Sequence, residues 1–178
     1  QPESSHHENG PGQNEIDFRA SDAMSTADNF ITYKNVVSAI SERNGVYASF
    51  APKPIRGKSG NGLHMKVSLF RKGVNLEEVD PQMSKSFMAG VFNRMRDITL
   101  FLNPQVESYE RFGVNEAPKY ITWSAQNRSR LMRVPVVHGK KAGFILRSPD
   151  SGINPYVAFG MVVRAGLEGV KNKETLPP

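Results

Sequence analysis

The sequence contains no cysteine and no long apolar run, and each absence excludes a class of protein. Without cysteine there is no disulfide framework and no thiol chemistry, which fits a reducing compartment, and we expect a cytoplasmic protein. No apolar stretch approaches the roughly 20 residues of a membrane-spanning helix, and the mean hydropathy is −0.45. A basic run interleaved with aromatic residues, typical of nucleic-acid surfaces, is also missing. We therefore expect neither a membrane nor a nucleic acid as partner.

The 178 residues suffice for one domain with a sizeable core, and 38% of them are hydrophobic. The net charge of +6 indicates an anionic partner. Arginines concentrate between Arg111 and Arg147, which favours a small phosphate or carboxylate ligand. The chain begins with Gln1 and ends in Leu-Pro-Pro, so we expect a piece of a longer protein.

Hydrophobic periodicity predicts both strands and helices along the chain. Strands are expected at 15–19, 46–51, 63–70, 120–123, 130–137 and 142–147. Helices are expected at 22–44, 84–102 and 154–170, with residues 71–82 as a polar connector. Ser21 or Asp22 is the capping residue of the first helix and Asn154 that of the last, and Gly45 ends the first. The order lacks the strict alternation of a parallel α/β fold. We predict an α+β fold whose curved, mainly antiparallel sheet has helices packed on one face.

The stretch SHHENGPGQNEIDF places two carboxylates on either side of a tight turn. A turn at Gly10 to Gly12 would bring Glu8 and Glu15 together, and two close carboxylates repel unless a proton or cation lies between them. Carboxylates with one or two imidazoles suit Mg²⁺ or Mn²⁺ better than zinc. The alternative is a solvated hairpin with surface glutamates and ordinary polar histidines at His6 and His7.

Two further groups of residues indicate an anionic ligand. The glycine-rich stretch 57–62 lets backbone amides approach an anion, and the strand after it places His64, Lys66 and Ser68 on one face. That face is alternatively the exposed side of an amphipathic strand. Arginine forks match phosphate and carboxylate oxygens, although any one of these arginines could be an ordinary surface residue. The four candidate arginines are Arg111, Arg128, Arg133 and Arg147.

These motifs resemble those of the glutamine synthetase family. HHENGPGQNEIDF is similar to the family's glutamate-rich core, and SGNGLHMKVSL is similar to its glycine-rich loop and metal-histidine strand. Further similar motifs follow in the family's order: NPQVESYERF, NEAP, WSAQNRSRLMRVP, LRSPD and NPYVAFGMVVRAGLEGVKNK. The resemblance runs from about Pro2 to Lys173. It implies that residues 1–178 are a truncated catalytic domain, without the family's N-terminal β-domain and C-terminal helices.

The resemblance also implies an activity and a set of site residues. The family joins ammonia or an amine to the γ-carboxyl of glutamate, using ATP and Mg²⁺ or Mn²⁺ through a γ-glutamyl phosphate. The implied metal ligands are Glu8 and Glu15 for one ion and His64 for a second. The implied nucleotide-binding residues are Glu3, His6, Ser68, Arg128 and Arg133. The implied substrate-binding residues are Gly60, Arg111 and Arg147. The implied catalytic residues are Glu116, which takes a proton from ammonium, and Arg128, Arg133 and Arg147, which face the phosphate.

The sequence departs from the family pattern in four places. Ile145 stands where the family has a metal-binding glutamate, Gly143 where it has a nucleotide-binding arginine, and Lys66 where it has the second histidine of a His-x-His pair. The segment between Arg111 and Glu116 is also one residue shorter. Two hypotheses follow: an ATP-dependent ligase that uses glutamate or a related acid, or a non-catalytic relative repurposed for ligand binding, regulation or assembly. The parent protein is expected to form a homo-oligomeric ring, and the isolated chain to be an inactive monomer or dimer.

Overall fold

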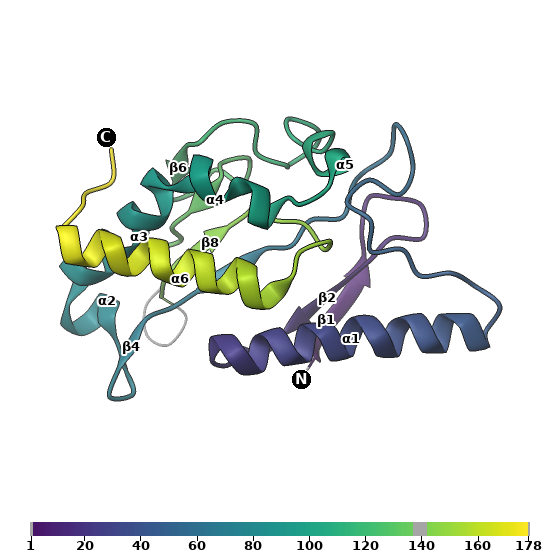
Figure 1. Ribbon diagram of the computed structural model, residues 1–178, viewed down its shortest axis with the longest axis horizontal. Coiled ribbons are helices and arrows are strands. Elements are labelled where there is room, and N and C mark those ends of the chain that lie inside the picture. The colour runs from purple at the N-terminus through teal and green to yellow at the C-terminus, as the bar shows by residue number, and fades with distance from the viewer. Residues whose placement is uncertain (1, 137–141, 178) are drawn as a thin grey trace.

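The computed structural model describes residues 2–136 and 142–177 (Figure 1). The main sheet has four strands in the order β3 (Met65–Val67), β8 (Phe144–Leu146), β7 (Met132–Arg133) and β6 (Trp123–Ser124). The first two pairings are antiparallel and the β6–β7 pairing is parallel. The prediction of a mainly antiparallel sheet in an α+β fold is therefore confirmed.

Helices cover one face of this sheet. Met65, Leu146 and Met132 lie opposite one another on β3, β8 and β7, and all three are buried. They share the hydrophobic core with side chains of α3 (Pro81–Asn93), α4 (Met95–Leu102) and α6 (Pro155–Asn172). Because side chains alternate along a strand, their neighbours in sequence point to the opposite face.

The N-terminal segment forms a hairpin and a helix beside the main sheet. Strands β1 (Pro2–His7) and β2 (Asn14–Phe18) make an antiparallel hairpin next to helix α1 (Ala23–Arg43), at the right of Figure 1. The Asp22 side chain accepts a hydrogen bond from the Ser25 amide, and Gly45 follows the helix with a φ of +70°. Both predicted ends of this helix are confirmed. Among the described residues, no helix is long and apolar enough to cross a membrane.

The strand predicted at 46–51 is wrong. This segment has no strand partner among the described residues. Instead, the side-chain amide of Asn61 donates hydrogen bonds to the carbonyl oxygens of Ser49 and Ala51. The β-branched and aromatic residues here gave a strand pattern, but two carbonyl oxygens of the segment accept hydrogen bonds from a side chain of the following loop instead of from a neighbouring strand.

The polar connector predicted at 71–82 is also wrong, and the helix predicted at 84–102 is two helices. The connector contains a small hairpin of β4 (Phe70–Arg71) and β5 (Val74–Asn75), followed by α2 (Leu76–Val79). Helices α3 and α4 meet at Arg94, whose guanidinium bonds the carboxylate of Glu174 at 2.8 Å and that of Glu168 at 3.1 Å. A short helix, α5 (Val106–Tyr109), follows α4.

The remaining strands are shorter than the patterns predicted. The predicted strand at 63–70 keeps only Met65–Val67 before the chain turns into β4, and the one at 130–137 keeps Met132–Arg133. The one at 120–123 keeps only Trp123, because β6 is Trp123–Ser124. Residue 137 lies outside the described residues. The last helix begins after Asn154, with Pro155 at its first position, as predicted.

Candidate active site

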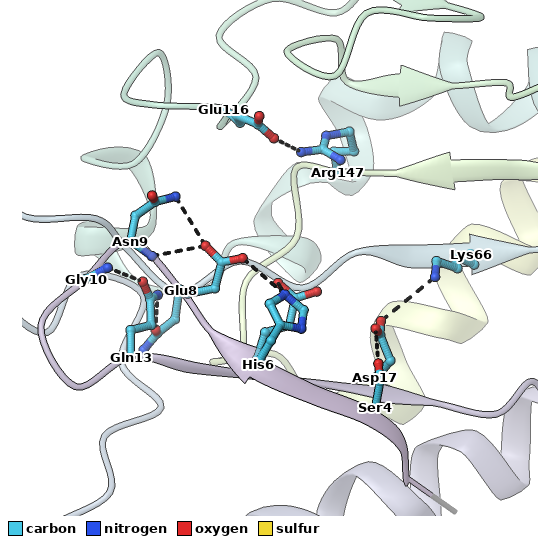
Figure 2. A network of polar contacts seen from close by, with 12 residues as sticks. Ser4, His6, Glu8, Asn9, Gly10, Gln13, Asp17, Lys66, Glu116 and Arg147 are labelled. Carbon is cyan, nitrogen blue, oxygen red and sulfur yellow. Dashed lines mark hydrogen bonds and ion pairs between the residues drawn. The ribbon is translucent and has the colours of Figure 1, made fainter.

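The hairpin turn brings two carboxylates and an imidazole together. The Glu8 amide donates to the carbonyl oxygen of Gln13, and Gly12 has a φ of +66° that favours glycine. His6 lies directly opposite Glu15, and its Nε2 is 3.5 Å from a Glu8 oxygen and 3.8 Å from a Glu15 oxygen (Figure 2). One ligand atom from each residue lies within 4.8 Å of the other two.

The electrostatics of this cluster favour a cation. Partial burial raises the pKa of Glu15, and the nearby Glu8 and Asp17 carboxylates raise it further. A divalent ion would remove this repulsion, and two carboxylates with one imidazole are suitable ligands for Mg²⁺ or Mn²⁺. The group that the structure assembles contains His6 with Glu8 and Glu15, whereas the sequence assigned His6 to the nucleotide and His64 to a metal.

Gln13 ties the hairpin to the glycine-rich loop. Its side-chain amide donates to the Gly60 carbonyl at 3.0 Å and to the Asn61 side chain at 2.8 Å. A side chain at position 60 would approach the Pro52 carbonyl to 2.5 Å and the Arg111 side chain to 2.8 Å. Position 60 therefore needs glycine, which lets the loop lie against Arg111. Gln13 and Asn61 were not among the residues predicted from the sequence, although Gln13 belongs to the same motif as Glu8 and Glu15.

Arg111 is buried under this loop. It is 4% exposed and lies 3.6 Å from the fully buried Asp150. Its guanidinium donates to the carbonyl oxygens of Ser148 and Pro149, each at 3.3 Å. Burial lowers the pKa of Arg111, and Asp150 opposes that shift. The protein thus holds the predicted substrate-binding arginine in a fixed position, through an aspartate that the sequence analysis did not single out.

A second ion pair joins a separate loop to the sheet side of the site. Glu116 is exposed, and its carboxylate accepts a hydrogen bond from the buried Arg147 at 3.0 Å (Figure 2). The loop is also held by Asn115, whose amide donates to the Ser59 hydroxyl of the glycine-rich stretch. Burial lowers the pKa of Arg147, Glu116 opposes the shift, and the positive charges of Arg133 and Arg128 add to it. Two other predicted catalytic arginines, Arg133 and Arg128, therefore lie within electrostatic reach of Arg147.

His64 lies between these charged groups. Burial of the ring lowers the pKa of His64 to about 4, and the positive charges of Arg147 and Arg111 act in the same direction, while Glu8 opposes them. The residue as a whole is exposed, so water screens part of this effect but does not change its direction. The imidazole is neutral at physiological pH, which is the form that binds a metal.

The other predicted residues lie at the edges of this arrangement. Glu3 is exposed on β1. Ser68 is half-buried after β3, and its hydroxyl lies 2.9 Å from the place where a Cβ of residue 143 would stand. The structure thus gathers the predicted residues from the hairpin, the loops and the sheet, rather than from one shared sheet face.

Comparison with known proteins decides the family. The model of the family "Glutamine synthetase, catalytic domain" matches residues 1–178. This chain belongs to the glutamine synthetase catalytic-domain family. It is 47% identical to the glutamine synthetase of Methanosarcina mazei over 180 residues and 44% identical to that of Pyrococcus furiosus over 176. These alignments cover 97% of this chain and 40% of each relative, so the chain spans less than half of their length.

Solved structures agree with this assignment. A cryo-EM structure of Plasmodium falciparum glutamine synthetase superimposes with a TM-score of 0.91 at 27% identity, over 97% of this chain and 35% of that one. A structure described as a GmaS/ADP complex superimposes with a TM-score of 0.90 at 31% identity, over 99% of this chain and 43% of that one. The fold of a glutamine synthetase catalytic domain is therefore shown.

Two departures from the glutamine synthetase pattern are built into the sheet. Gly143 has a φ of +152°, and a Cβ there would lie 2.1 Å from the Val67 carbonyl oxygen. No larger side chain fits without a shift of the backbone. Ile145, the second departure, lies on β8 between Lys66 of β3 and Arg133 of β7.

Proposed function

We propose that this chain is the metal-, nucleotide- and acid-binding part of a cytoplasmic, ATP-dependent carboxylate–amine ligase. The reaction joins ammonia or an amine to the γ-carboxyl of glutamate, or of a related acid, through a γ-glutamyl phosphate. The observation that carries the proposal is the His6/Glu8/Glu15 cluster, together with Arg147 and the positive charges of Arg133 and Arg128 that act on it. Family membership and the superposition on a GmaS/ADP complex support a nucleotide in this site.

The residues divide the work by charge. Glu8 and Glu15, with His6 and His64 nearby, would hold a divalent ion, which supplies positive charge to the phosphates of ATP. Arg128, Arg133 and Arg147 stabilise the charge that develops on the transferred phosphoryl group. Arg111, fixed by Asp150 below the glycine-rich loop, binds the carboxylate of the acid together with Gly60.

Glu116 is suited to handle a proton. It is the exposed partner of Arg147 on a loop, so it can reach an incoming ammonium ion while it remains next to the phosphoryl arginines. We expect it to accept the proton that ammonium loses before attack. Glu3 and Ser68 contact the nucleotide in this proposal.

The test uses the full-length protein that contains this chain. With Mg-ATP, glutamate and ammonia or hydroxylamine, we expect formation of glutamine or of its hydroxamate together with phosphate release. Glu8→Gln should lower kcat by at least about 100-fold. The variant would hold the divalent ion less tightly, so the phosphates would lose the positive charge that the ion supplies. Glu78→Gln is the control, because Glu78 is exposed on α2, at the opposite end of the molecule from the hairpin turn (Figure 1). Equal activity of both variants would contradict the proposal.

A non-catalytic relative is the second candidate, and Ile145 and Gly143 are the observations that favour it. Ile145→Glu discriminates the two. In a ligase with an altered site, the new carboxylate strengthens nucleotide binding. Mg-ATP then raises the melting temperature of the variant more than that of the unmodified protein. In a repurposed protein, the carboxylate destabilises the fold by about 1–3 kcal/mol, and Mg-ATP fails to restore the loss.

A further inference from the structure

The face of the sheet opposite the helices carries a row of two cations with an apolar residue between them. Lys66, Ile145 and Arg133 lie directly opposite one another on β3, β8 and β7. The adjacent row of Met65, Leu146 and Met132 is buried under the helices, so the first row faces the other way.

The hairpin face that carries Glu15 contacts this row through Asp17 and Lys66. Glu15 and Asp17 are two residues apart on β2 and therefore point to the same side. Glu15 belongs to the cluster with His6 and Glu8, while Asp17 lies 3.8 Å from the Lys66 ammonium (Figure 2). The Asp17–Lys66 pair is thus about 7 Å along the strand from the cluster.

Among the described residues, the sheet row itself offers positive charge and no carboxylate, and the nearby Asp17 and Glu116 are each paired with a cation. Ile145 cannot ligate a metal, and no side chain fits at Gly143. Arg133 and Arg147 each have a buried Nε that has no hydrogen-bond partner among the described residues. A divalent cation at this row would find no unpaired carboxylate among these described residues, because Asp17 and Glu116 already pair with Lys66 and Arg147, whereas a phosphate would find several donors.

We propose that this site binds a single divalent cation, at His6, Glu8 and Glu15, and that the Lys66 ammonium neutralises the phosphate from the sheet side. The Lys66 side chain is 70% exposed, so it can exchange Asp17 for a phosphate oxygen without disturbing the core. The identity of the anion as a nucleotide phosphate rests on the proposed function.

The first measurement counts metal ions. Electron paramagnetic resonance of free Mn²⁺, titrated with this chain, should show one bound ion per chain. That ion should be lost in Glu15→Gln and retained in Lys66→Gln. Two bound ions per chain would overturn the proposal.

The second measurement uses tripolyphosphate as the probe, in saturating Mg²⁺. Calorimetry should show tripolyphosphate binding about 10- to 100-fold weaker in Lys66→Gln, because the charge-assisted hydrogen bond from the Lys66 ammonium to a phosphate oxygen is lost. Asp17→Asn should bind the probe at least as tightly as the unmodified chain, since it removes the carboxylate that competes for Lys66. Lys85→Gln, at an exposed position of α3, controls for the loss of one positive charge. Equal affinities for Lys66→Gln and Lys85→Gln would overturn the proposal.

These measurements separate the inference from the proposed ligase. One Mn²⁺ and Lys66-dependent tripolyphosphate binding, in a full-length protein without ligase activity, would support the inference and contradict the ligase. Ligase activity with two Mn²⁺ ions, or with tripolyphosphate binding that is independent of Lys66, would do the reverse.

Discussion

At the scale of single residues, the sequence predicted the carboxylate pair because the pair is local. Glu8 and Glu15 flank a turn that Gly12 permits, and a short hairpin needs no distant partner to bring them together. The environment of Arg111 could not be predicted, because Asp150 reaches it from far along the chain. Local motifs gave the candidate site residues, and tertiary contacts determine which of their charges meet.

Glu15→Gln tests whether the repulsion at the cluster is real. The pKa of Glu15 is raised above 4.5, so the metal-free chain loses stability as pH rises from 4.5 through that higher pKa. The glutamine variant should lack this loss of stability. Mn²⁺ should raise the melting temperature of the unmodified chain and not that of the variant. Thermal melts from pH 4 to 7, with and without Mn²⁺, make the comparison. A variant that Mn²⁺ stabilises as strongly as the parent would contradict the assignment.

His64 should titrate well below its ordinary pKa of 6.5, toward the value of about 4. A histidine whose folded pKa is depressed binds fewer protons folded than unfolded between these two values, so stability falls as pH drops from 6.5 toward 4. The check is the ring-proton titration by NMR. A His64 midpoint near 6.5 would show that neither burial nor the arginines lower its pKa.

At the scale of elements, helices with local signals were predicted better than strands. The Asp22 and Asn154 caps accept hydrogen bonds from the next turn of their own helices, and such contacts are readable in sequence. Strands of two or three residues depend on partners elsewhere in the chain. The break at Arg94 depends on Glu168 and Glu174, more than 70 positions away, so periodicity carried no sign of it.

Two glycines set how closely α3 and α6 approach. A Cβ at Gly169 would lie 2.4 Å from the Gly90 Cα and 2.3 Å from the Ser86 carbonyl oxygen. Gly169→Ala should therefore destabilise the chain by about 3 kcal/mol, because backbone must move. Gly160 is on the same helix, with open space around it, and Gly160→Ala should stabilise by about 0.5–1 kcal/mol. Urea unfolding measures both, and equal effects would contradict this packing.

At the scale of the whole molecule, the candidate site draws on elements outside the main sheet as well as on its strands. Gln13 of the hairpin donates a hydrogen bond to Gly60 of the glycine-rich loop, and Asn115, next to Glu116, donates one to Ser59 of the same loop. The family motifs in the sequence named candidate residues. They could not predict that these residues would come from the hairpin, the loops and the sheet together.

Exposed apolar side chains on α4 and α6 bear on the assembly of the isolated chain. Leu100 is 62% exposed and Leu167 is 58% exposed, and the two helices pack against each other. Apolar patches of this kind favour association, but Arg164, Glu168 and Lys171 flank the α6 side and limit it. We expect a monomer or dimer in light scattering, with any dimer weakened in Leu167→Gln. Tyr47→Gln, which changes a side chain that is 85% exposed in the segment after α1, is the control. A ring-sized particle, or a dimer that both variants weaken equally, would contradict association through α6.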